Sequence, residues 1–242
     1  MKNEADDPRR RLLIQMLAAG FFSGGSTASN LAFAQIFGSP PTKLPPGKSV
    51  YRVQGAVQVD GRPATPDTRI VRNSRIETGS DGELVYAVGQ SAFIARANTQ
   101  VIVETGPEES TVVTGLRVLA GKLLSVFPSR RPVQIQTKVA SVGIRGTGVY
   151  LESDPEQTYF CTCYGVAEVA ANNDPESREV VTASHHDRPL YILGNEPKGR
   201  NIRNAPFINH TDQELMLIET LVGRQPPFVF PKSDYTGPRR SY

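Results

Sequence analysis

The sequence contains no tryptophan, only two cysteines and three histidines, and no run of 18 apolar residues among its 242 residues. The absence of such a run excludes a polytopic membrane protein. Aromatic residues make up only 7% of the chain, which argues against an aromatic platform for carbohydrates. The net charge is +3 and the 27 basic residues are scattered, whereas nucleic-acid-binding proteins concentrate them in a patch. The sequence therefore predicts no nucleic-acid partner.

The N-terminal residues have the order of a bacterial export signal. Basic residues Arg9–Arg11 precede a moderately apolar stretch, which ends at Ala32-Phe33-Ala34. The segment Arg-Arg-x-Leu-Leu at residues 9–13 resembles the twin-arginine motif of proteins that are exported already folded. We expect residues 1–34 to be a signal peptide cleaved after Ala34, which leaves no transmembrane segment and places the protein in the periplasm. An uncleaved single-span anchor is the alternative.

The next residues divide into a linker and a β domain. Four prolines between Ser39 and Pro46 favour an extended linker over residues 35–47. From residue 48 to residue 172, short runs such as Tyr51–Val59 alternate apolar with polar residues, which is typical of strands with one buried face. Turn residues such as Asp60-Gly61 separate these runs. We expect an all-β domain, an antiparallel sandwich or jelly roll.

A C-terminal extension over residues 173–242 carries the one strong helix pattern, near residues 212–222. Thr211 can cap this helix, Glu214 completes a capping box, and Gly223 can end it. Apolar residues at helical spacing, from Leu215 to Val222, would dock the helix on the β domain.

The order of the turn and strand motifs resembles the FecR domain family. The motifs are Gly55–Gly61, Ile76–Gly79, Asp81-Gly82, Gly89–Ile94, Asn98–Ile102, Gly115–Lys122 and Val142–Gly148. The resemblance implies an all-β periplasmic domain, best known in regulators that relay the state of an outer-membrane iron transporter to a sigma factor. Only about eleven residues precede the apolar N-terminal stretch, so no cytoplasmic anti-sigma region is expected. The resemblance therefore indicates a domain and a compartment, and it leaves the partner or ligand open.

The glycine-rich segment Gly143–Gly148 has two interpretations. It could cradle a phosphate, but it lacks the Gly-Lys-Ser/Thr ending of a P-loop and no helix pattern follows it. A bulge or tight turn is the preferred interpretation, with Arg145 as a buried or rim ion-pair residue.

The cysteines and histidines are the candidate metal ligands. Cys161 and Cys163 lie two apart in an expected strand and therefore share one face. All five such residues fall within 50 positions of one another, and they are Cys161, Cys163, His185, His186 and His210. Two cysteines and two of the three histidines match the ligand set of a tetrahedral zinc or iron site, or of a cluster with mixed ligands. Which of the neighbouring histidines faces inward is not decided by the sequence.

Other interpretations of the same residues stay open. The two cysteines can form a disulfide if the strand is distorted, since a regular strand holds their Cα atoms too far apart. They can also be the exchanging pair of a thiol–disulfide redox enzyme. A scaffold without metal, bound to an envelope protein or a polysaccharide, is the third possibility. We expect a non-catalytic binding or sensing module that holds a metal ion.

Overall fold

The computed structural model describes residues 41–107, 111–129 and 131–228, so the predicted signal peptide lies outside the described residues. These residues form fourteen strands and one α-helix, α3 (Asp212–Leu221). The strands are β1 (Val50–Gln54), β2 (Val57–Val59), β3 (Arg62–Pro63), β4 (Arg75–Thr78), β5 (Glu83–Val88), β6 (Ser91–Ala95), β7 (Gln100–Thr105), β8 (Val113–Val126), β9 (Pro132–Gln136), β10 (Ala140–Ser153), β11 (Gln157–Ala171), β12 (Asp174–Ala183), β13 (Leu190–Leu193) and β14 (Ile202–Asn204).

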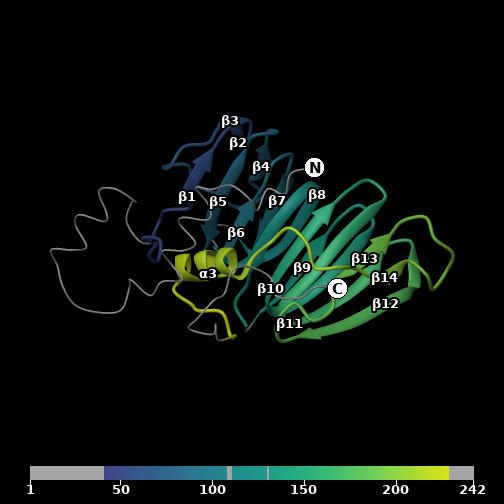
Figure 1. Cartoon of the computed structure of the whole chain (residues 1–242). Coiled ribbons are helices and arrows are strands. Elements are labelled where there is room, and N and C mark those ends of the chain that lie inside the picture. Colours follow the sequence, from purple (N-terminus) through teal and green to yellow (C-terminus); the bar gives the residue numbers. More distant parts are fainter. Residues whose placement is uncertain (1–40, 108–110, 130, 229–242) are drawn as a thin grey trace.

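All fourteen strands belong to one hydrogen-bonded sheet that folds over into two layers (Figure 1). The first layer contains β3, β2, β4, β7 and β9, and β12 lies at its edge on β11. The second layer contains β1, β5, β6, β13 and β14. The long strands β8, β10 and β11 pass from one layer to the other, because their two halves pair with different neighbours.

Each long strand bends at a glycine with positive φ. These residues are Gly121 in β8 (φ 89°), Gly146 in β10 (φ 60°) and Gly165 in β11 (φ 92°). In β10 the register with β11 shifts between Arg145 and Gly148, so the predicted bulge in this segment is confirmed. Arg145 itself is exposed, so of the two expected positions, buried or at the rim, the buried one is wrong.

The main hydrophobic core lies between the two layers. Its members include Ile76, Val101 and Val118 from the first layer, and Phe93 and Leu151 from the second. A second apolar cluster covers the opposite face of the second layer, where α3 packs on β5, β6 and β8. The second layer is therefore buried on both faces, which explains why every residue of β5 and β6 is buried.

The helix begins and ends as its sequence predicts. The Thr211 hydroxyl accepts a hydrogen bond from the Glu214 backbone, and the Glu214 carboxylate accepts one from the Thr211 backbone. Gly223, with φ 73°, follows the C-cap residue Val222. The expected all-β fold with a single C-terminal helix is confirmed. Among the described residues, no helix has the length and apolar content needed to cross a membrane.

Three strands lie beyond the last strand that the sequence pattern indicated. β12, β13 and β14 occupy residues 174–204 and extend the sheet from β11. They bring the chain back toward the second layer, so that the residues after β14 cross its outer face on the way to α3. This path brings His210 close to the cysteines of β11.

The bend in β10 gives a stability prediction. A Cβ at Gly146 would lie 2.3 Å from the Ser129 Cα, in a backbone conformation that side chains disfavour. We expect Gly146→Val to lower the free energy of unfolding by at least about 2 kcal/mol, as measured by urea denaturation. Gly143→Ala is the matched control, because a Cβ there meets its nearest atom, Gln134 Oε1, at 3.7 Å. Equal stability of the two variants would contradict the assigned bulge.

Candidate metal centre

Strand β11 places the two thiols on the outer face of the second layer. Cys161 and Cys163 alternate with Thr162, so both side chains point to the α3 side of the sheet. Both are free thiols, and neither is exposed to solvent. The sequence prediction that they share one face is confirmed.

His186 reaches this face from the turn after β12. Its backbone N–H donates to the Cys163 carbonyl at 2.9 Å, which fixes the turn against β11. His186 has φ 54°, and its side chain is buried against the thiols. The neighbouring His185 is 39% exposed and contacts Asp212 and the ring of His186 instead of the thiols. The structure thus decides which of the two histidines faces inward.

His210 comes from the segment just before α3. Its Nδ1 lies 2.7 Å from the Ile208 carbonyl oxygen, which can only accept a hydrogen bond. The proton is therefore on Nδ1, and Nε2 is left with a free lone pair directed at Cys163. The ring stacks on Tyr150, with centroids 4.4 Å apart. These contacts hold His210 with the correct nitrogen facing the thiols.

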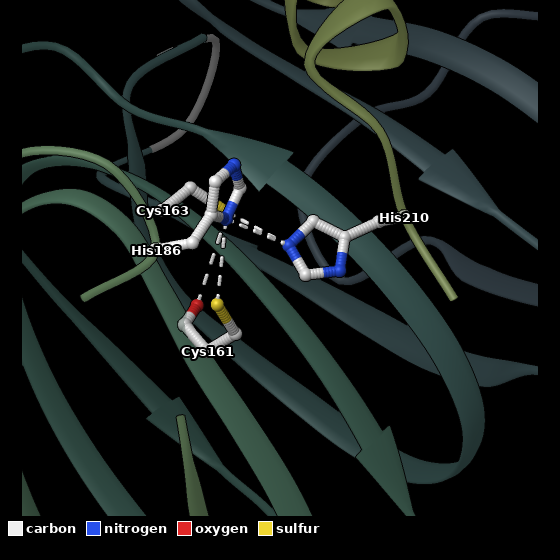
Figure 2. A group of neighbouring side chains, drawn as sticks. All are labelled: Cys161, Cys163, His186 and His210. Atoms are coloured by element: carbon white, nitrogen blue, oxygen red, sulfur yellow. Dashed lines mark hydrogen bonds between the residues drawn. The ribbon is translucent and has the colours of Figure 1, made fainter. Parts of the chain in front are cut away.

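The four inward groups surround one point (Figure 2). Cys161 Sγ lies 3.5 Å from His186 Nδ1, Cys163 Sγ lies 3.4 Å from His210 Nε2, and the two histidine nitrogens are 3.1 Å apart. All four ligand atoms lie within 4.8 Å of one another. A tetrahedral zinc ion would set S–N separations of about 3.5 Å and N–N separations of about 3.3 Å, given the usual bond lengths. The residues present therefore fit a single tetrahedral metal ion.

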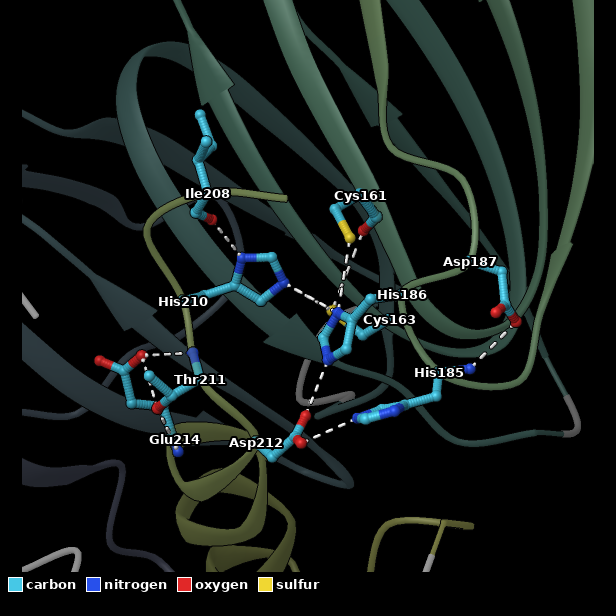
Figure 3. Close-up of polar contacts among 10 residues, drawn as sticks. All are labelled: Cys161, Cys163, His185, His186, Asp187, Ile208, His210, Thr211, Asp212 and Glu214. Carbon is cyan, nitrogen blue, oxygen red and sulfur yellow. Dashed lines mark hydrogen bonds and ion pairs between the residues drawn. The ribbon is translucent and has the colours of Figure 1, made fainter. Parts of the chain in front are cut away.

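Asp212, the first residue of α3, holds both neighbouring histidines (Figure 3). Its Oδ1 lies 2.8 Å from His186 Nε2 and its Oδ2 lies 2.8 Å from His185 Nε2. Because a carboxylate accepts, the His186 proton is on Nε2 and Nδ1 faces the thiols. This carboxylate–histidine arrangement is typical of the groups that orient metal ligands. His185 therefore joins the site through Asp212, and it lies outside the Cys161–Cys163–His186–His210 group.

A buried arginine fixes the segment that carries His210. Arg96 is fully buried in the second layer, and its Nη2 lies 2.8 Å from both carboxylate oxygens of Glu214. Its Nη1 donates to the carbonyl of Asn209, and its guanidinium lies over Tyr150, 5.4 Å from the ring centroid. The arginine thus ties the His210 turn and the first turn of α3 to the sheet.

The neighbours of the thiols and of His186 shift their pKa values in different directions. Burial raises the pKa of Cys161, but the hydrogen bond with Cys163 and the nearby His210 and His186 outweigh it and lower this pKa well below the usual range. Burial and Cys161 raise the pKa of Cys163 well above that range. Burial lowers the pKa of His186, but Asp212 and Cys161 outweigh it and raise this pKa to about 9. Thiols and imidazoles release protons when they bind a metal ion, so metal binding at this site depends on pH.

Sequence reasoning found the four inward ligands but missed Asp212 and Arg96. Asp212 follows His210 by two positions and lies in the first helical turn, where acidic residues are common in any helix. Arg96 is 118 positions from Glu214, and no local pattern marks such a pair. Asp212 and Arg96 are identified only by their contacts with distant segments in the folded chain.

Comparison with known proteins leaves the family open. No protein-family model matches the sequence, and no curated protein matches it. Among solved structures, two crystal structures of a candidate anti-sigma factor from Parabacteroides distasonis ATCC 8503 are similar, each with a TM-score of 0.44. The identities are 13% and 14%, and each match covers 56% of this chain and 60% of the other. Similarity at this level assigns neither family nor function.

The Arg96–Glu214 pair gives a prediction for the support of the site. Arg96→Met leaves a buried carboxylate without its cation, so we expect a loss of about 3–5 kcal/mol in the free energy of unfolding. The double variant Arg96→Met/Glu214→Gln should recover much of this loss. Arg188→Met is the control, since that arginine pairs with Glu179 while 49% exposed and should cost less than about 1 kcal/mol. Urea denaturation of the four proteins tests this, and equal losses for Arg96→Met and Arg188→Met would refute it.

Proposed function

We propose that this chain is a non-catalytic binding or sensing module of the bacterial envelope, built on a FecR-like β domain and stabilised by one metal ion. Cys161, Cys163, His186 and His210 hold the ion, and zinc or iron fits this mixed set of sulfur and nitrogen ligands. The observation that carries the proposal is the separation of 3.1–3.5 Å between neighbouring ligand atoms from three distant segments.

The same distances favour a single ion over an iron–sulfur cluster. In a two-iron cluster with mixed ligands, the cysteines bind one iron and the histidines bind the other. The sulfur atoms would then lie well apart from the ring nitrogens. Here each sulfur lies within 3.5 Å of a ring nitrogen, which is the edge length of one tetrahedron.

The ligand number supports a structural role for the metal. Four protein ligands complete a tetrahedron, whereas catalytic zinc sites keep one position open for water or substrate. All four ligands are buried, at 4% exposure or less. In this proposal the ion joins β11, the turn after β12 and the segment before α3, and it supplies Lewis-acid binding of these ligands.

The envelope location is supported by the sequence. The N-terminal 34 residues have the pattern of a twin-arginine signal, and the ordered strand motifs resemble FecR domains. The twin-arginine route exports proteins that have already folded, which suits a site loaded with metal in the cytoplasm. The partner of such a module would be an envelope protein or a polysaccharide.

A thiol–disulfide exchange enzyme is the second candidate function. The lowered pKa of Cys161 favours it, because thiolates are the reactive form. The full burial of both thiols opposes it, because an exchanging thiol must meet its substrate. Insulin reduction by the wild-type protein, lost in Cys161→Ser, would establish this enzyme activity in place of the structural metal.

The neighbouring histidines provide a matched test of the metal site. We expect the purified protein to bind about one equivalent of zinc or iron, measured by elemental analysis without chelator. His186→Ala should lose most of this metal and should melt at a lower temperature, because a ligand is missing. His185→Ala should keep at least half an equivalent, since His185 lies outside the Cys161–Cys163–His186–His210 group and meets the site through Asp212 and the ring of His186.

Two results would overturn the metal proposal. One is metal-free wild-type protein with a mass two protons below the dithiol form, which would mean a disulfide. The other is equal metal content in wild type and His186→Ala. Cobalt substitution adds a spectroscopic check, since tetrahedral cobalt with thiolate ligands gives intense visible and near-ultraviolet bands.

The export part of the proposal has its own test. The full chain expressed in a bacterium should yield periplasmic protein that starts at Gln35. Intact-mass analysis measures the cleavage, and substitution of both Arg9 and Arg10 by lysine should leave uncleaved protein in the cytoplasm. Retention of residues 1–34 in exported protein would support the single-span anchor instead.

A further inference from the structure

We infer that the metal ion acts as a clamp on helix α3, and that α3 passes the state of the site to the linker before the β domain. This inference rests on the metal site of the proposed function. It adds that binding and release of the ion change the docking of the helix.

The first turn of α3 is connected to the site at two points. His210, a ligand, directly precedes the N-cap residue Thr211. Asp212, the next residue, accepts a hydrogen bond from the Nε2 of His186, a second ligand. A metal ion held by both histidines therefore fixes the backbone before the helix and the first side chain within it.

The remaining contacts of α3 are made by the apolar and charged side chains of its buried face. Its apolar contact with the sheet comes chiefly from Leu215, Ile218 and Leu221. Glu219 is buried, and burial raises its pKa even though Tyr164 and Arg224 contact its carboxylate. A ten-residue helix is marginal in water on its own, so its docking depends on tertiary anchors. Loss of the ion removes the anchor that the two histidine ligands provide, and it leaves the Arg96–Glu214 pair as the polar anchor of the first turn.

The other end of α3 holds the linker. The backbone N–H of Leu44 donates to the carbonyl of Leu221 at 2.9 Å, and the Leu44 side chain packs on the same apolar cluster as the helix. A Cβ at Gly223 would lie 3.0 Å from Lys43, so the linker also follows the chain after the helix. Helix α3 spans about 15 Å, and it joins the metal ligands at one end to the linker at the other.

The clamp covers an apolar surface of the second layer. Beneath α3 lie apolar side chains of the second layer, among them Val85, Ala87, Ile94 and Leu124. When the helix is docked, these side chains are buried. Release of α3 would expose this surface and free the linker together, so one event at the metal would change two parts of the protein.

Amide hydrogen exchange on the full metal-loaded chain tests the clamp. Removal of the ion with a chelator should raise the exchange rates of amides in α3 and at Leu44 by at least tenfold. Amides in β8 and β10 should change by less than twofold, because these strands are held by the main core. Cys163→Ser serves as a control for the chelator, since the variant lacks a ligand and its exchange should not respond.

Asp212→Asn separates the clamp from the metal site itself. All four ligands remain, so the variant should bind metal, with an affinity about 10–100-fold weaker. At saturating metal, α3 amides should still exchange several-fold faster than in wild type. Asp174→Asn is the matched control, because Asp174 is equally buried but bonds only to Ser177, Gly199, Asn201 and Glu176. It should leave metal affinity and α3 exchange unchanged.

The outcomes distinguish the two proposals. If wild-type protein binds no metal, the proposed site fails and the clamp fails with it. If metal binds but its removal leaves α3 and Leu44 protected, the site stands and the clamp is refuted. If Asp212→Asn and Asp174→Asn behave alike at saturating metal, Asp212 has no coupling role.

Discussion

The burial of the second sheet layer on both of its faces is the constraint on which the other features depend. One face packs on the first layer, and the other is covered by α3 and the segment before it. The covering chain must bring apolar side chains, and it must also satisfy every polar group that it buries. The Arg96–Glu214 pair, the capping box and the Asp212 contacts satisfy several of these groups, and they also hold the candidate metal ligands in place.

In each of the two inward histidines, the ring nitrogen that faces away from the thiols makes a hydrogen bond. These two bonds organise the site. The Ile208 carbonyl accepts a hydrogen bond from Nδ1 of His210, and the Asp212 carboxylate accepts one from Nε2 of His186. The lone pair on the other nitrogen of each ring then points at the thiols of Cys161 and Cys163. While α3 is docked, these hydrogen bonds orient the ligand nitrogens toward the thiols.

The sequence predicted what local patterns determine. The alternation in residues 48–172, the capping box at Thr211 and the shared face of the cysteines are local, and each appears in the structure. The strand β12 was missed because its first six residues, Asp174–Glu179, are largely polar and lie at a sheet edge. The inward choice of His186 over His185 depends on a turn with positive φ at His186, which an alternating pattern does not reveal. Asp212 and Arg96 depend on contacts between distant segments.

The spacing of the ligands along the chain has a consequence for biosynthesis. Cys163 leaves the ribosome 47 residues ahead of His210, which completes the ligand set. At ordinary rates of translation this interval lasts about 2–9 s. During that time the thiols exist without their final histidine, open to oxidation or to capture by another metal. Delivery of the correct ion is therefore a matter of timing as well as of affinity.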